Sequence, residues 1–269
     1  MATLMEASFG SIAETRKIVP SKRNATRYHE SINDGSGSEW FGVDSAATVA
    51  SVLDEGWADG VKRLNDALGS VEVPPVRSIK RRRIRADEGD ELNIHDVYAG
   101  DLDLAWRRIG KREKAGPRRI TLVANIGALG DVTADELFWR GASMLKLADA
   151  LTEAGYTVKI IAVSSADKIS ADGFMDGWFQ VTVKEFDQPL SVNSVASVIC
   201  LAGYFRTVVF CWRSTMQKQV SGGWGRTNHT RVLQRFHGQK DCIVVDTDIC
   251  NAETAGAWIL RTVQNLEAA

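Results

Sequence analysis

The sequence predicts an α/β protein built on a mostly parallel open sheet that is flanked by helices. Residues 119–163 give the strongest indication: an apolar run over 120–126, an amphipathic helix over 134–154 and a second apolar run over 156–163. A strand, a helix and a strand in this order make one crossover unit of a parallel sheet. The later segments continue the alternation, which indicates helices on both faces of the sheet.

Two local signals define the helix within this unit. Thr133 and Glu136 stand three residues apart, which is the spacing of a capping box at a helix N-terminus. The small and apolar side chains that we expect to be buried recur at helical spacing on one face. They are Leu137, Gly141, Met144, Ala148 and Leu151.

The segments that follow are expected to extend the sheet and its helical layers. The predicted strands cover 178–183 (an edge strand), 207–212 and 242–246. The predicted helices cover 192–202, 230–236 and 252–265. The last helix is expected to turn four side chains inward, namely Ala255, Ile259, Leu260 and Val263.

Composition divides the chain into three predicted parts. Residues 1–39 are rich in Ser, Asn, Arg and Gly, which is typical of a flexible arm. Residues 40–118 are predicted to form a helical and basic extension, interrupted by Gly56 and Gly60. Residues 119–269 contain the alternating strands and helices and form the predicted α/β domain.

Overall composition disfavours several classes of protein. The 269 residues carry a net charge of −1, which gives no general attraction to nucleic acid or anionic membrane. The longest apolar run, residues 195–205, is too short to span a bilayer, and the N-terminus lacks a signal-peptide pattern. The four cysteines lie in apolar contexts without C-x-x-C spacing, which favours reduced thiols. These features predict a cytoplasmic protein with no membrane partner.

One segment is distinctive in charge. Residues 77–119 contain 13 Lys and Arg against 8 Asp and Glu. Within them a basic run can contact phosphates of nucleic acid without sequence preference, through Lys80, Arg81, Arg82, Arg83 and Arg85. Acidic residues follow directly, so a solvated and locally neutralised segment is the alternative interpretation.

A glycine-rich loop over residues 221–230 is a second candidate contact. Trp224 can stack on a base, and Arg226 together with backbone amides can hold a phosphate. A surface loop without a ligand is the alternative.

Acidic side chains follow the predicted strand over 242–246. Asp246 and Asp248 at the carboxyl end of a strand are natural ligands for a hard cation such as Mg²⁺. In an enzyme, Arg226 or His229 would assist them. The alternative is that Asp248 caps the last helix.

The loop over 125–135 offers an anion-binding helix N-terminus or a simple turn, and it lacks the lysine of a phosphate loop.

The half of the chain from Arg119 resembles a von Willebrand factor A-like domain. In that family the first strand ends in an Asp-x-Ser-x-Ser ion site, where this chain has Asn125 at the start of Asn-Ile-Gly-Ala-Leu. Thr227 and Asp246 stand where the family has a coordinating threonine and a late aspartate. The resemblance therefore implies a degenerate metal site, with Asn125, Thr227, Asp246 and Asp248 as its candidate ligands. The Asp246-Thr247-Asp248 sequence is also similar to the acidic motifs of haloacid-dehalogenase-like phosphatases and topoisomerase-primase nucleases.

A second resemblance concerns the helix over 134–154 and the segment before it. The sequence Arg140-Gly141-Ala142 and the Gly56-Trp57 pair are similar to uncharacterised proteins of tailed bacteriophages. This resemblance implies a phage-encoded protein of the host cytoplasm.

These features favour a non-catalytic binding protein that engages a protein or nucleic-acid partner where the strands end. The sequence lacks a nucleophile–base pair, a metal quartet and a phosphate loop, so no cofactor is expected other than Mg²⁺. Two alternatives stay open: a Mg²⁺-dependent phosphoesterase or nuclease that uses Asp246 and Asp248, and a virion or assembly component.

Overall fold

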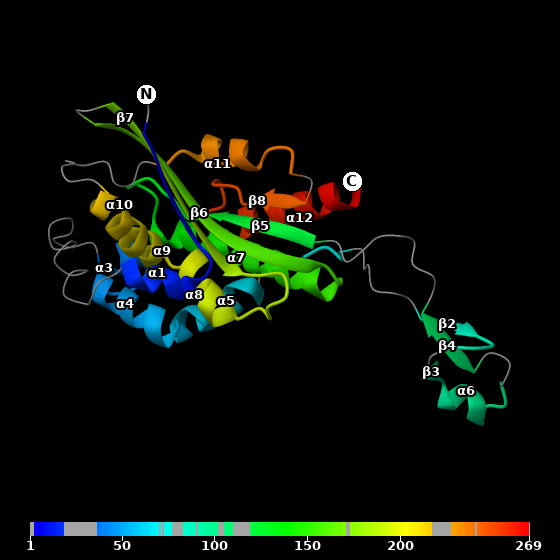
Figure 1. The fold of residues 1–269 in the computed structure, drawn as a ribbon. Helices are drawn as coiled ribbons and strands as arrows, with labels where there is room; N and C mark the ends of the chain where they lie inside the picture. The colour runs from blue at the N-terminus through cyan, green and yellow to red at the C-terminus, as the bar shows by residue number, and fades with distance from the viewer. Residues whose placement is uncertain are drawn as a thin grey trace.

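The computed structural model describes residues 3–18, 37–69, 71, 73–76, 83–89, 91–101, 105–109, 119–170, 173–216, 227–239 and 241–268. These residues form a main body around a five-stranded sheet and a small module around a three-stranded sheet (Figure 1). The strands of the main sheet are β1 (Thr3–Phe9), β5 (Arg119–Asn125), β6 (Thr157–Ser170), β7 (Gly173–Lys184) and β8 (Cys242–Val244).

The main sheet has the strand order β1-β7-β6-β5-β8. β5 runs parallel to both β6 and β8, and β1 runs parallel to β7, whereas β6 and β7 are antiparallel. The predicted fold class, a mostly parallel open sheet flanked by helices, is confirmed. β7 lies between β1 and β6, so the prediction of an edge strand over 178–183 is wrong, because β1 supplies a further neighbour.

The predicted crossover unit is confirmed. β5 leads into α7 (Ala134–Glu153) and then into β6, which continues beyond its predicted end. Glu136 N donates a hydrogen bond to Thr133 Oγ1 at 3.2 Å, and Thr133 N donates to Glu136 Oε2 at 2.7 Å, which completes the capping box. All five residues of the predicted stripe on this helix are buried.

Helices cover the two faces of the main sheet unequally. One face is covered by α7, α8 (Val192–Ile199) and α12 (Ala252–Ala268), while α4 (Ala46–Glu55) and α5 (Ala58–Gly69) pack on the outside of these helices, and together they form the larger core. On the opposite face lies α11 (His229–Phe236), whose Val232 packs against Val123, Ile161 and Trp178 (Figure 1). Alternate residues of β5 and β6 enter the two cores, as expected for strands buried on both faces.

The N-terminal residues correct one prediction. Residues 3–9, expected to belong to a flexible arm, form β1 along β7. Phe9 contacts Phe179 with ring centroids 5.4 Å apart, while Glu6 and Ser8 are exposed. The alternation of exposed and less exposed side chains is therefore that of a half-buried strand. The polar residues that follow it made the whole segment resemble a flexible arm in the sequence. Residues 19–36 of the predicted arm lie outside the described residues.

A second correction concerns the predicted strand over 207–212. The chain there is helical: α9 (Ala202–Tyr204) continues through a π-helical turn, η3 (Phe205–Val209), into α10 (Phe210–Met216). Every residue from 201 to 213 is buried, so the helix has no polar face and shows no helical periodicity in sequence. Burial on all sides made the apolar run look like a central strand.

The last helix follows its prediction except at one position. Ala255, Ile259 and Val263 are buried, whereas Leu260 is exposed. Position 260 directly follows 259, and a helix turns about 100° per residue, so it faces away from the core.

The predicted extension over 40–118 contains two different structures. Near the main body, α3 (Gly37–Phe41), α4 and α5 pack as helices, and Gly56 separates the last two with a φ of +91°. The small module contains β2 (Arg83–Ala86), β3 (Glu91–Leu92), α6 (Ile94–Tyr98) and β4 (Trp106–Ile109). It is a β-sheet with one short helix rather than a helical segment.

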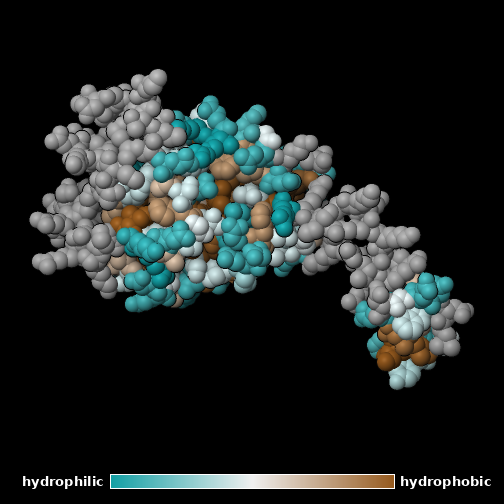
Figure 2. All heavy atoms as spheres, viewed as in Figure 1, coloured by the Kyte–Doolittle hydropathy of each residue, from teal (hydrophilic) through white to brown (hydrophobic). Residues whose placement is uncertain are grey.

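The small module exposes apolar side chains. Seven large hydrophobic residues are exposed among the described residues, and four of them belong to this module: Leu92, Ile94, Tyr98 and Trp106. Figure 2 shows an apolar patch over the module, which lies away from the main body in this view. Exposed apolar area of this kind commonly marks an interaction site.

Among the described residues, no single helix combines the length and the apolar character needed to cross a membrane. The segments Val192–Ile199 and Ala202–Arg213 pass this test only as a pair, and they are bent by 61°.

Candidate functional site

The strand order of the main sheet reverses at β5. β5 has β6 on one side and β8 on the other. The helices that follow β5 and β8, α7 and α12, pack together on one face of the sheet, whereas α11, which precedes β8, lies on the opposite face. Open α/β sheets bind ligands outside the carboxyl ends of their strands. We call the space between the turns after β5 and β8 the strand-end crevice.

The turns that meet at this crevice differ in part from those expected. The turns after β5 and β8 come together, because Val245 N donates to the Val123 carbonyl at 3.0 Å. The predicted strand over 207–212 would have placed a third turn after residue 212, but that residue lies inside a helix. Its place is taken by the turn before α11, which carries Thr227 and is tied to β6 by a bond from Asn228 N to the Ser165 carbonyl at 3.1 Å.

Asn125 and His229 form a polar pair at the crevice. Asn125 is buried, and its Oδ1 accepts from Gly127 N at 3.2 Å. Its Nδ2 therefore donates to His229 Nδ1 at 3.1 Å, which requires the neutral imidazole. Burial is the main cause that lowers the pKa of His229, and Arg140 lowers it further, while Asp246 opposes the shift. The pair is thus arranged around an uncharged histidine.

Small and hydroxyl side chains meet beside this pair. A Cβ placed on Gly127 would lie 2.6 Å from Thr227 Oγ1 and 2.8 Å from Ser164 Oγ, so only glycine fits without displacement. Ser164 lies in β6 beside the crevice, and its Oγ accepts a hydrogen bond from Arg213 Nη2 at 2.9 Å. The predicted site residues Asn125 and Thr227 are therefore brought near each other through Gly127.

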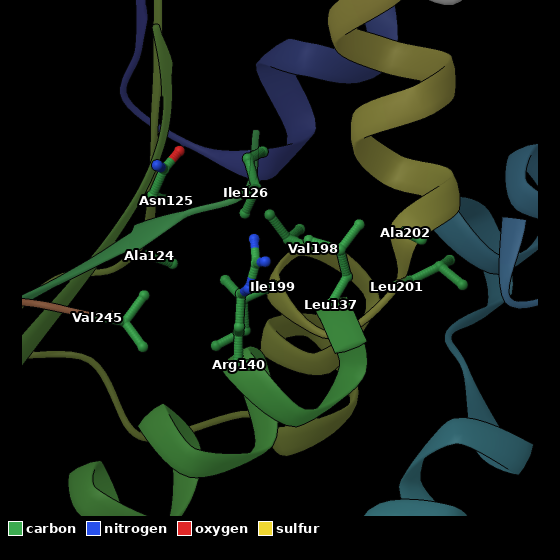
Figure 3. Close-up of a pocket in the computed structure, with 11 residues that line it drawn as sticks. Ala124, Asn125, Ile126, Leu137, Arg140, Val198, Ile199, Leu201, Ala202 and Val245 are labelled. Atoms are coloured by element: carbon green, nitrogen blue, oxygen red, sulfur yellow. The ribbon is translucent and has the colours of Figure 1, made fainter. Parts of the chain in front are cut away.

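A pocket lies beneath the end of β5, on the α7 face of the sheet. Most of its lining is apolar, including Ile126, Leu137, Val198 and Val245. Figure 3 shows Arg140 extending from α7 into this pocket, with its guanidinium toward the end of β5. Arg140 is the cationic side chain in the lining, and burial is the main cause that lowers its pKa.

The acidic candidates lie at the outer side of the crevice. Asp246 forms an ion pair with Arg261, and Thr247 Oγ1 donates to Asp248 at 3.5 Å. No group of three or more His, Cys, Asp or Glu able to hold a metal ion occurs among the described residues. A metal ion at Asn125, Thr227, Asp246 and Asp248 stays a prediction, and Arg261 would compete with the ion for Asp246.

The nucleic-acid candidates are described only in part. Lys80, Arg81, Arg82, Trp224 and Arg226 lie outside the described residues. The remaining two arginines of the basic run, Arg83 and Arg85, belong to β2, and Arg83 is its first residue.

The side chain of Arg85 is described and is engaged within the small module. It forms an ion pair with Asp96, and its Nη1 lies 3.8 Å from Asp101 Oδ2. The charge of Arg85 is therefore neutralised within the module, as in the alternative interpretation, but by Asp96 and Asp101 rather than by the acidic residues that directly follow the run.

Three residues of the crevice were missed by sequence reasoning: Arg140, Ser164 and Arg213. A signal for Arg140 existed, because position 140 lies three residues after Leu137 and four before Met144, within the predicted buried stripe. A charged residue at such a position is unusual and points to a function or a partner. Ser164 and Arg213 carried no comparable signal, since their meeting depends on the tertiary structure.

Comparisons with known proteins give a single finding. A family model described as "Domain of unknown function (DUF7192)" matches residues 3–266 of the chain. No curated protein and no solved structure matches it.

Proposed function

Because the chain belongs to the DUF7192 family, whose description names no activity, we propose a function from the strand-end crevice itself. We infer a non-catalytic binding protein that engages a protein partner at this end of the main sheet. The resemblance of the chain to von Willebrand A-like domains and to tailed-phage proteins is compatible with this proposal.

The chemistry of the crevice supports binding rather than catalysis. A serine nucleophile needs a base that accepts its proton, but the fully buried Ser164 accepts a hydrogen bond from Arg213. The His229 Nδ1 is occupied by Asn125. Burial raises the pKa of the thiols of Cys200, Cys211 and Cys242, to about 11 for the last two, so they are poor nucleophiles at neutral pH.

The observation that carries the proposal is Leu129. This side chain is 47% exposed in the loop that follows β5, directly at the crevice. A single exposed leucine is common on protein surfaces, so the weight of Leu129 comes from its place at the carboxyl end of β5, where open α/β sheets bind their ligands. The exposed apolar residues of the small module provide a second surface of the same kind.

A protein partner is favoured over nucleic acid by the charges. Arg85 is paired with Asp96 and Asp101. Arg235 is likewise paired with Glu6, and Arg261 with Asp246. Because a nucleic-acid surface needs cations available to phosphates, these pairs weaken that alternative.

Site-specific photocrosslinking in the native cells tests the proposal. A photoreactive amino acid would replace Leu129 at the crevice, and Leu260 on α12 provides a matched control because the two are 47% and 45% exposed. We expect position 129 to yield a discrete protein crosslink that position 260 lacks. Equal labelling from both positions, or none from 129, would contradict the proposal, and a crosslink to RNA or DNA would replace the protein partner with nucleic acid.

A further inference from the structure

Arg140 is a buried cation without a counterion among the residues that the structure describes. It is 7% exposed, and its Nε has no hydrogen-bond partner. Among the described residues, no ion pair and no hydrogen bond to its guanidinium is formed. Glu136 and Asp248 act on it electrostatically from outside ion-pair distance, and Glu136 is used in the helix cap.

A second buried arginine shows how this fold satisfies a structural guanidinium. Arg206 is 1% exposed, donates to the carbonyls of Trp40 and Val132, and lies 3.7 Å from the centre of the Trp40 ring. Its charge is thus surrounded by acceptors that tie three segments together. Within the described part of the chain Arg140 has no equivalent set of acceptors, although a buried charge without a partner is costly to keep.

The surroundings of Arg140 indicate which ligand would complete it. The guanidinium extends into the pocket beneath β5 (Figure 3), where Ile126, Leu137, Val198, Ile199 and Val245 form apolar walls. A guanidinium pairs with a carboxylate through two parallel hydrogen bonds, and apolar walls accommodate an aliphatic stem. A phosphate is a poorer fit, because a dianion with several acceptor oxygens needs more donors than this lining offers.

We propose that the Arg140 pocket binds a carboxylate group carried on a short aliphatic stem. The proposal deepens the proposed function and rests on it for the location, since the pocket opens at the same strand-end crevice. The carboxylate belongs either to a small free acid or to the side chain of a glutamate presented by the partner. Both sources share the chemistry that Arg140 recognises.

The binding test uses the purified full chain and four probes. Butyrate and its uncharged analogue butyramide represent the free acid. The N-acetyl methylamides of glutamate and of glutamine represent the partner's side chain. We expect a saturable rise in melting temperature with a carboxylate and none with its amide, and the probe with the larger response identifies the source. A carboxylate response no larger than that of the amide would overturn the proposal.

Two variants identify the residue responsible. In Arg140→Met the apparent affinity for the carboxylate should fall by about tenfold or more, as expected for loss of a charge-assisted pair. The ligand-free variant should melt at the wild-type temperature or above, because an unpaired buried charge has been removed. Arg206→Met is the matched control and should melt at a lower temperature, because two carbonyls lose their donor.

Two outcomes would refute the assignment to Arg140. One is that Arg140→Met is destabilised as strongly as Arg206→Met or fails to fold, since Arg140 would then be a structural residue. The other is a carboxylate response retained in Arg140→Met. In the wild-type protein, the NMR resonance of the Arg140 Nε–H group should shift when butyrate is added and not when butyramide is added. An unchanged Arg140 resonance in the presence of butyrate would count equally against the proposal. None of these measurements depends on the crosslink from Leu129, so the two proposals can fail separately.

Discussion

The contact between α7 and the end of α8 positions Arg140, and Gly141→Ala tests it directly. A Cβ on Gly141 would meet the backbone carbonyl of Ile199 and lie 2.6 Å from Cys200 Sγ. Backbone atoms cannot move aside as a flexible side chain does, so the added methyl group must separate the two helices. Gly256 provides the matched control, because it also lies inside a helix and a Cβ there would meet nothing within 4 Å.

The magnitudes follow from two opposing effects. Replacing glycine by alanine inside a helix stabilises by about 0.5–1 kcal/mol. Overpacking costs about 1–3 kcal/mol, and contact with backbone favours the upper end. We therefore expect Gly141→Ala to lose about 2 kcal/mol of unfolding free energy, and Gly256→Ala to gain about 0.5–1 kcal/mol.

Urea unfolding followed by far-UV circular dichroism measures both variants, with an unchanged slope as the sign that only stability has changed. The expected shifts in melting temperature are a fall of about 4–8 °C for Gly141→Ala and a rise of about 1–4 °C for Gly256→Ala. If Gly141→Ala is as stable as Gly256→Ala, the close approach of α7 to Ile199 does not exist, and the placement of Arg140 fails with it.

Two further predictions concern the polar groups of the crevice. Because burial lowers the pKa of His229 below its usual 6.5, the unfolded chain binds its proton first, so stability should fall as pH drops below about 6.5 and level off below the folded pKa. An NMR titration of the His229 ring measures this pKa. The His229→Gln variant should show a smaller slope of stability against pH. A measured pKa above the usual value would contradict the prediction and would mean that the charge of Asp246 outweighs burial. Because Arg261 already pairs with Asp246, millimolar Mg²⁺ should leave the melting temperatures of the wild type and of Asp246→Asn/Asp248→Asn unchanged. A Mg²⁺-dependent rise that the double variant abolishes would instead support the Mg²⁺-dependent enzyme.

Sequence reasoning located the crossover unit well, for local reasons. The capping box at Thr133 and Glu136 and the stripe on α7 depend on residues three or four apart, whose interactions are set within one helix. The same holds for α11, predicted over 230–236 and observed as His229–Phe236. Such elements are predictable because their signals lie within one turn of the chain.

The errors arose where burial or a distant partner decided the structure. The run over 207–212 is helical although its apolar residues suggested a strand, because burial on all sides removes the periodicity that distinguishes a helix from a strand. β1 became part of the sheet because β7 offers it a parallel partner more than 160 residues away, as the pairing of Thr3 with Met175 shows.

The sequence by itself determined the α/β class, the unit from β5 to β6 and the turn in which Asn125 and Gly127 lie. The tertiary structure decided which groups meet there. His229, Ser164 and Arg213 come from three other segments, and their contacts with Asn125 and with one another depend on strand order rather than on local pattern. The same is true of Arg140. The sequence shows a charged residue on a buried helix face, but only the packing of the helices shows that no carboxylate among the described residues lies within ion-pair distance of it.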